Sequence, residues 1–77
     1  MVEKLRINAI YNDFISNVNL TEEQIRILDM YIKKESTVKM AMEIGVSPRT
    51  ITYEIKKIKQ LYNDYVFMQT WKAMLLM

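Results

Sequence analysis

Six side chains that can bond a nucleic acid gather within nine residues near the middle of the chain. They follow the only proline of the sequence and are Arg49, Thr50, Thr52, Tyr53, Lys56 and Lys57. Arg49 carries a planar fork of donors that matches the O6 and N7 acceptors of guanine. Lysine and hydroxyl groups suit phosphate oxygens, and the threonine methyl suits the methyl group of thymine. This combination of residue types predicts contact with double-stranded DNA.

Three isoleucines indicate the helix that would present these side chains. Ile51, Ile55 and Ile58 recur at spacings of four and three residues, which keeps them on one face of an α-helix. Ser47 can cap such a helix with its hydroxyl, and Pro48 supplies a suitable φ at the first helical position. We therefore expect a helix over residues 48–62 that buries its isoleucines and exposes its polar side.

A shorter helix and a tight turn precede this segment. Ala41 is small enough to let two helices cross closely, and Gly45 can take the left-handed conformation that ends a helix. The sequence thus predicts a helix over residues 37–44, capped by Ser36 or Thr37. Together the two helices form a helix-turn-helix whose second member enters the major groove. The side chains expected to face the interior from the first helix are Met40, Ala41 and Ile44.

The rest of the chain completes an all-α prediction of a small helical bundle. Apolar periodicity predicts one helix over residues 2–17, and a capping box at Thr21 and Gln24 starts a second helix that runs over residues 22–33. Asn63-Asp64 favour caps over helix interiors, so we expect a break there and a last helix over residues 64–76. The predicted buried positions are Leu5, Ile10, Tyr11, Phe14, Ile15 and Val18 in the first helix, and Ile25, Leu28 and Tyr31 or Ile32 in the second.

Length and composition indicate a single domain, residues 1–77, with more apolar surface than it can bury alone. Apolar residues make up 51% of the 77 residues, and seven of them are methionines. A chain of this size buries only roughly 60% of its unfolded surface. We expect a homodimer formed by the segment 63–77, through Phe67, Met68, Trp71, Met74 and Leu75. In the alternative, Phe67 and Trp71 fold back onto the first helix.

Charge and the missing residue types narrow the class of function. The net charge is +2, and it concentrates as +4 over residues 33–60 against −2 over residues 1–32. Without cysteine or histidine the chain has no disulfide, no thiolate or imidazole metal site and no histidine-assisted nucleophile. We expect no enzyme activity, no metal and no cofactor. Since no apolar run approaches the ~20 residues that span a bilayer, we expect a soluble, cytoplasmic, nucleoid-associated protein with no membrane partner.

Residues 20–62 resemble the LuxR/GerE-type helix-turn-helix domain and are also similar to region 4 of bacterial sigma factors. The matching residues are Leu20-Thr21, Ile27-Leu28, Ala41, Ile44-Gly45-Val46-Ser47, Thr50-Ile51 and Ile58. The resemblance implies that the helix over 37–44 braces the DNA backbone, that the next helix reads bases, and that a helix beyond it dimerises. The chain departs from the family at Lys34-Glu35, where glycine is usual, and at Glu54, where histidine is common.

These observations favour a sequence-specific, dimeric transcriptional regulator. The composition resembles coding by an AT-rich genome, which suggests a low-GC bacterium or one of its phages as the source. The predicted DNA contacts are Thr37, Lys39, Ser47, Arg49, Thr50, Thr52, Tyr53, Lys56 and Lys57. Dimerisation would place two recognition helices about 34 Å, one turn of DNA, apart. An alternative is a protein-interaction module that docks on RNA polymerase or a host factor through its apolar C-terminal helix. A DNA-recognition part of replication or packaging machinery is a third possibility.

Overall fold

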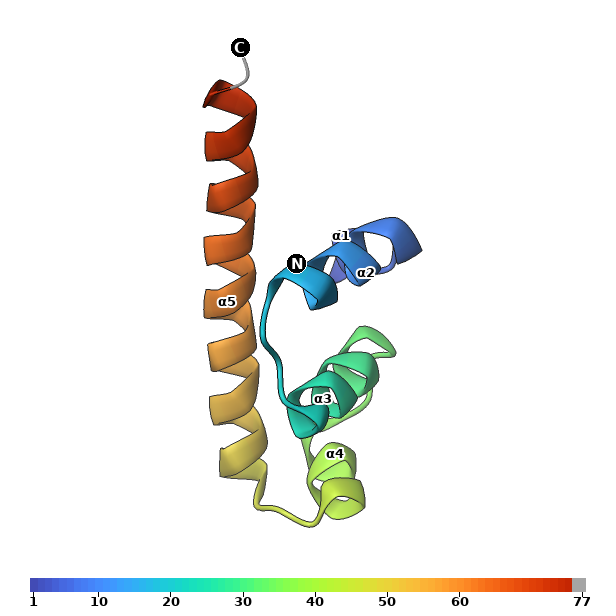
Figure 1. The fold of residues 1–77 in the computed structure, drawn as a ribbon. Coiled ribbons are helices and arrows are strands. Elements are labelled where there is room, and N and C mark those ends of the chain that lie inside the picture. Colours follow the sequence, from blue (N-terminus) through green and yellow to red (C-terminus); the bar gives the residue numbers. More distant parts are fainter. Residues whose placement is uncertain (76–77) are drawn as a thin grey trace.

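The computed structural model describes residues 1–75 and consists of five α-helices (Figure 1). The helices are α1 (Val2–Leu5), α2 (Asn8–Asn17), α3 (Glu22–Ile32), α4 (Thr37–Ile44) and α5 (Pro48–Leu75). No strand occurs within these 75 residues, which confirms the all-α prediction. The molecule measures 47 × 20 × 17 Å because α5 runs its whole length. The other four helices lie beside the N-terminal part of α5, and its C-terminal part projects past them (Figure 1).

The core lies where α5 packs against the shorter helices. Phe14, Ile27, Ile51 and Ile58 are almost completely shielded from solvent, and Ala41 of α4 is also buried. Tyr62 extends this core toward α2, where its ring meets Phe14 edge-on at a centroid distance of 5.5 Å. The full set of buried hydrophobic residues is Leu5, Phe14, Ile27, Leu28, Met40, Ala41, Ile51, Ile58 and Tyr62.

The predicted helix ends of α3 and α4 are confirmed. Thr21 Oγ1 accepts a hydrogen bond from the Gln24 amide, and the Gln24 side chain accepts one from the Thr21 amide, which completes the capping box. Ser36, rather than Thr37, caps α4 through the Lys39 amide. Gly45 ends α4 at φ 83°, in the left-handed region.

The single helix predicted over residues 2–17 is wrong, because the chain breaks between α1 and α2. Ile7 is extended, with ψ 115°, and its side chain is exposed. Leu5 and Phe14 are nine residues apart, about two and a half turns, so one straight helix would point them in opposite directions. The break lets both side chains reach the same core. Ile10, Tyr11 and Val18 are half-buried against that core.

The break predicted at Asn63-Asp64 is also wrong, since α5 continues without interruption to Leu75. Both side chains are exposed, so neither has to be accommodated in the core. On the opposite side of the helix, Tyr62 and Tyr65 both pack on the Phe14 ring and hold this turn in place.

The buried face of α3 differs in register from the prediction. Gln24, Ile27 and Leu28 are buried, whereas Ile25 is only half-buried. The stripe of α3 that faces the core therefore starts one residue earlier than expected, at the capping residue Gln24.

Lys34 occupies the position where the family that the sequence resembles usually has glycine. It adopts φ 63°, in the left-handed region that glycine enters without steric cost. Its amide donates to the Tyr31 carbonyl, and the Glu35 amide donates to the Met30 carbonyl, both at 3.0 Å. These two bonds form the Schellman arrangement at the end of α3, and they require the left-handed residue.

Candidate nucleic-acid interface

The first turn of α5 is fixed by Ser47 and oriented by Ile51. Ser47 Oγ accepts a hydrogen bond from the Thr50 amide at 3.2 Å and lies 3.0 Å from Thr50 Oγ1. Ile51 is fully buried, so the isoleucine side of α5 faces α3 and α4, and the opposite side faces solvent. Both hydroxyls were predicted to bind phosphate, but the structure engages them with each other in the cap.

The exposed side of α5 brings four of the predicted DNA contacts together. Arg49, Thr52, Tyr53 and Lys56 line one shallow hollow on the surface, and we call them the reading face. Tyr53 is 59% exposed. Thr52 Oγ1 donates a hydrogen bond to the Pro48 carbonyl at 3.2 Å, so the hydroxyl proton of Thr52 already has an acceptor within the protein. The remaining hydrogen-bonding groups of this face are free to meet a ligand.

Lys57 lies beside the reading face and contacts one of its residues. Its Nζ atom sits 5.3 Å from the centre of the Tyr53 ring, a cation–π distance. Lys59, in contrast, lies 5.5 Å from the ring of Tyr31, which belongs to α3. The positive charge of Lys59 is thus directed toward the body of the protein.

Glu54 is turned away from the reading face. Its carboxylate accepts a hydrogen bond from Gln24 Nε2 at 3.1 Å, and Gln24 itself is buried. The sequence identified Gln24 only as a helix cap, because nothing local indicates a contact across 30 residues. With its carboxylate held toward α3, Glu54 leaves the reading face free of negative side chains.

The two predicted contacts on α4 are each partly engaged within the protein. Lys39 forms an ion pair with Glu35 at 2.9 Å, and the hydrogen bond to Glu35 raises the pKa of Lys39 above its usual value. Thr37 is half-buried in the first turn of α4. Lys39 still has 57% of its side chain exposed, so α4 also presents a basic group to solvent.

The C-terminal part of α5 presents an exposed apolar stripe. Phe67, Met68, Trp71, Met74 and Leu75 form it and are between 49% and 69% exposed. The alternative in which Phe67 and Trp71 fold back onto the first helix is wrong. The rings of Tyr62 and Tyr65 pack on the Phe14 ring of α2 instead, with ring centroids 5.5 and 5.4 Å from that of Phe14.

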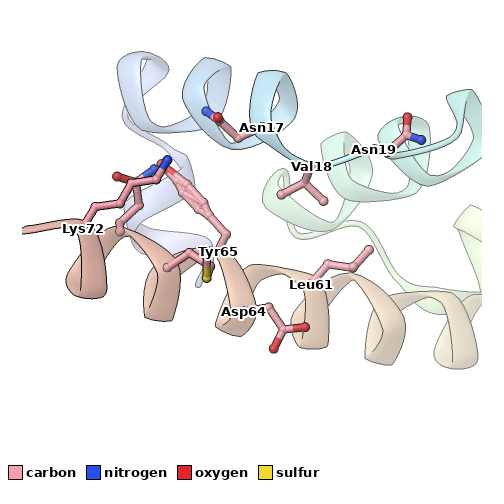
Figure 2. A pocket seen from close by; sticks show the side chains of 9 residues that line it. Asn17, Val18, Asn19, Leu61, Asp64, Tyr65 and Lys72 are labelled. Carbon is pink, nitrogen blue, oxygen red and sulfur yellow. The ribbon is translucent and has the colours of Figure 1, made fainter. Parts of the chain in front are cut away.

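A separate groove lies between α5 and the connector from α2 to α3 (Figure 2). It has a volume of about 370 Å³, and its lining mixes the apolar Val18 and Leu61 with the charged Asp64 and Lys72. Tyr65 closes one side, where its hydroxyl donates a hydrogen bond to Asp13. This groove flanks the apolar stripe, with which it shares Met68.

Two general findings bear on other kinds of function. Across residues 1–75 no three acidic side chains converge in a way that could hold a metal ion. In the same part of the chain, no helix combines the length and the apolar character needed to cross a bilayer.

Comparisons with known proteins found no relative of this chain. No family model matches the chain, and no characterised protein or solved structure is significantly similar to it.

Proposed function

We propose that the chain is a sequence-specific DNA-binding transcriptional regulator that inserts the first half of α5 into the major groove. One observation carries the proposal: the reading face is exposed on the side of α5 opposite its buried isoleucines. A major groove about 12 Å wide admits an α-helix presented in this way.

Each residue of this surface has a distinct proposed role. Arg49, in the first turn of α5, reads a guanine through its guanidinium fork. Tyr53 and the Thr52 methyl contact neighbouring base edges. Lys56 and Lys57 contact phosphates, which position the helix without reading sequence. The positive end of the α5 dipole adds to the attraction for the backbone.

The alternative of docking on RNA polymerase is less well supported by these residues. Such docking would use the apolar stripe and would not need a basic, solvent-exposed face at the other end of the helix. The hydrogen bond from Gln24 directs the carboxylate of Glu54, the only acidic residue between Pro48 and Asn63, toward α3. The reading face then carries no negative charge, which favours a polyanionic ligand.

Substitution of Arg49 tests the proposal most directly. A duplex selected from a random pool by the natural protein serves as the probe. We expect Arg49→Ala to weaken binding to this duplex by about 10- to 100-fold, because one bidentate base contact is worth ~1–3 kcal/mol. Mobility-shift titration measures the loss, and circular dichroism checks that the helices remain.

Arg26→Ala is the matched control, since Arg26 is exposed on α3 and its removal changes the net charge equally. If both variants lose affinity to the same degree, the effect is one of net charge, and the proposed role of Arg49 is wrong.

Salt dependence tests the phosphate contacts separately. We expect Lys56→Ala or Lys57→Ala to lower affinity for selected and random duplexes alike, because phosphate contacts carry no sequence information. The slope of log K against log salt should fall by about one for each contact removed. Lys59→Ala should leave the slope unchanged, since Lys59 points toward α3.

A further inference from the structure

We propose that a second copy of this chain binds the apolar stripe in parallel orientation, so that two α5 helices form a fork with one duplex in its mouth. The inference rests on the proposed DNA-binding function and adds to it the partner, the orientation of the pair and the arrangement of the DNA half-sites.

The first argument is that the reading face and the apolar stripe lie on the same side of α5. Eighteen residues make about five complete turns of an α-helix, so residues eighteen apart point in the same direction. Four polar or basic residues are followed at this interval by apolar ones. The pairs are Arg49 and Phe67, Tyr53 and Trp71, Lys56 and Met74, and Lys57 and Leu75.

The second argument is that this alignment is fixed. Helix α5 has no proline after Pro48 and no glycine, and it is unbroken between the two surfaces. The rise between Tyr53 and Trp71 is about 27 Å. Whatever covers the apolar stripe therefore determines where the reading face points.

The third argument selects the orientation. In a parallel two-fold pair, burying the stripe turns both reading faces toward the two-fold axis, on which a symmetric duplex can lie. An antiparallel pair centred on Trp71 would place the two Tyr53 residues about 54 Å apart, at opposite ends of the assembly. Their faces would then point in opposite directions, and one straight duplex could not meet both.

The separation of the two arms follows from helix geometry. Helices that cross at about 50° with their axes ~9 Å apart are a common packing class. If the crossing lies at Trp71, the axes are about 24 Å apart at Tyr53. The two reading faces then approach the duplex from opposite sides, as do the basic helices of other dimers that fork across the major groove. The fork therefore calls for an inverted repeat whose half-sites lie on opposite faces of the duplex.

The size of the apolar stripe indicates how stable the pair is without DNA. Helix α5 carries no charged residue between Asp64 and Lys72, so two copies of this segment can approach each other without bringing like charges together. The stripe offers two aromatic side chains, which bury at most ~150–250 Å² each, and three aliphatic ones. A standard interface buries ~800 Å² per partner, so this pair is a weak dimer that DNA stabilises.

Dimerisation is tested first in the absence of DNA. Trp71 is the only tryptophan and lies in the stripe. We expect its fluorescence maximum to move to shorter wavelength as protein concentration rises, in parallel with a monomer–dimer transition in sedimentation. Phe67→Glu should abolish both changes. Gln69→Glu, an equal charge change on the opposite side of α5, should leave them intact.

Orientation is tested by cross-linking, since the natural chain has no cysteine. In a parallel pair, Met74→Cys forms a disulfide with itself, and Gln69→Cys does not. An antiparallel pair would instead join Met68→Cys of one chain to Met74→Cys of another in a mixture of the two variants. Preferential formation of that mixed product would overturn the parallel fork.

The last test uses the selected duplex and separates this inference from the proposed function. We expect two chains per duplex, bound cooperatively, and loss of the second chain with Phe67→Glu while binding to one half-site persists. Arg49→Ala should bind the selected duplex more weakly but still dimerise. A chain that binds DNA singly and stays monomeric at high concentration would overturn the fork and leave the DNA-binding proposal standing. The fork is equally wrong if RNA polymerase, and not a second copy, protects Trp71.

Discussion

At the scale of single residues, two positions with left-handed backbone conformation allow the cost of that conformation to be measured apart from side-chain packing. Gly45 has φ 83° and Lys34 has φ 63°. A Cβ atom added at Gly45 would meet no other atom within 4 Å, so only the backbone conformation opposes a side chain there. The two positions therefore form a natural pair for mutation.

We expect Gly45→Ala to lower the free energy of unfolding by about 1 kcal/mol, because alanine is strained in the left-handed region. Lys34→Gly should raise it by about 0.5 kcal/mol, since the released strain is partly offset by the greater entropy of glycine in the unfolded chain. Urea denaturation measures both. A loss of stability in Lys34→Gly would show that the lysine side chain, and not its backbone, dominates at this position.

The residue scale also shows where sequence reasoning succeeds and where it stops. Thr21, Gly45 and Ser47 act through neighbours within a few residues, and their capping roles were predicted correctly. The hydrogen bond between Gln24 and Glu54 joins residues 30 positions apart. Such a contact depends on how α3 packs on α5, so no local pattern indicates it.

At the scale of elements, helix starts were predictable but helix continuity was not. Asn63 and Asp64 each cost well under 1 kcal/mol inside a helix. A break there would add one more helix end, with four more carbonyls that lack intrahelical partners, and this outweighs that small preference. The break between α1 and α2 has the opposite cause, since the need to bury both Leu5 and Phe14 overrides local helix propensity.

The cap of α5 gives a prediction at this scale. Ser47→Ala removes the acceptor of the Thr50 amide, and it should lower the free energy of unfolding by about 1 kcal/mol. Ser47→Asp keeps an acceptor and should restore most of the stability, although it adds a negative charge beside the reading face. Thermal unfolding followed by circular dichroism compares the two. Equal losses would mean that the hydroxyl does more than cap the helix.

At the scale of the whole molecule, two tyrosine–carboxylate pairs tie α2 to the rest of the bundle. Tyr65 of α5 donates to Asp13, and Tyr11 donates to Asp29 of α3. The hydrogen bond to Asp13, with burial second, raises the pKa of Tyr65 to about 12. Burial, followed by the bond to Asp29, raises the pKa of Tyr11 still further above its usual value.

These pairs predict a loss of stability in alkaline solution. Because the folded-state pKa of Tyr65 lies above the ordinary value of about 10, its contribution is complete below pH 10. It is lost as the pH rises through about 12. Urea denaturation at pH 9 and at pH 11.5 should show a decrease that is smaller in Tyr65→Phe and unchanged in the control Tyr53→Phe. The decrease is modest, since Tyr65 is only half-buried and solvent weakens its interaction with Asp13. An unaltered decrease in Tyr65→Phe would assign the effect to other groups.

The overall arrangement was only partly accessible from sequence. Apolar periodicity and capping identified the region from α3 to the first turns of α5, because its helices are short and close together in the chain. The packing of α2 on α5 depends on the ring of Phe14, which meets the rings of Tyr62 and Tyr65 about fifty residues further along the chain. Periodicity indicates that such rings are buried or exposed but not which of them meet.

The unbroken course of α5 has a consequence for how this protein can vary in length. One residue inserted after Tyr65 would rotate everything beyond it by about 100° relative to the segment before it. Both ends would keep their chemistry, yet they would no longer share an azimuth. Natural insertions and deletions should therefore be rare between Ile58 and Phe67.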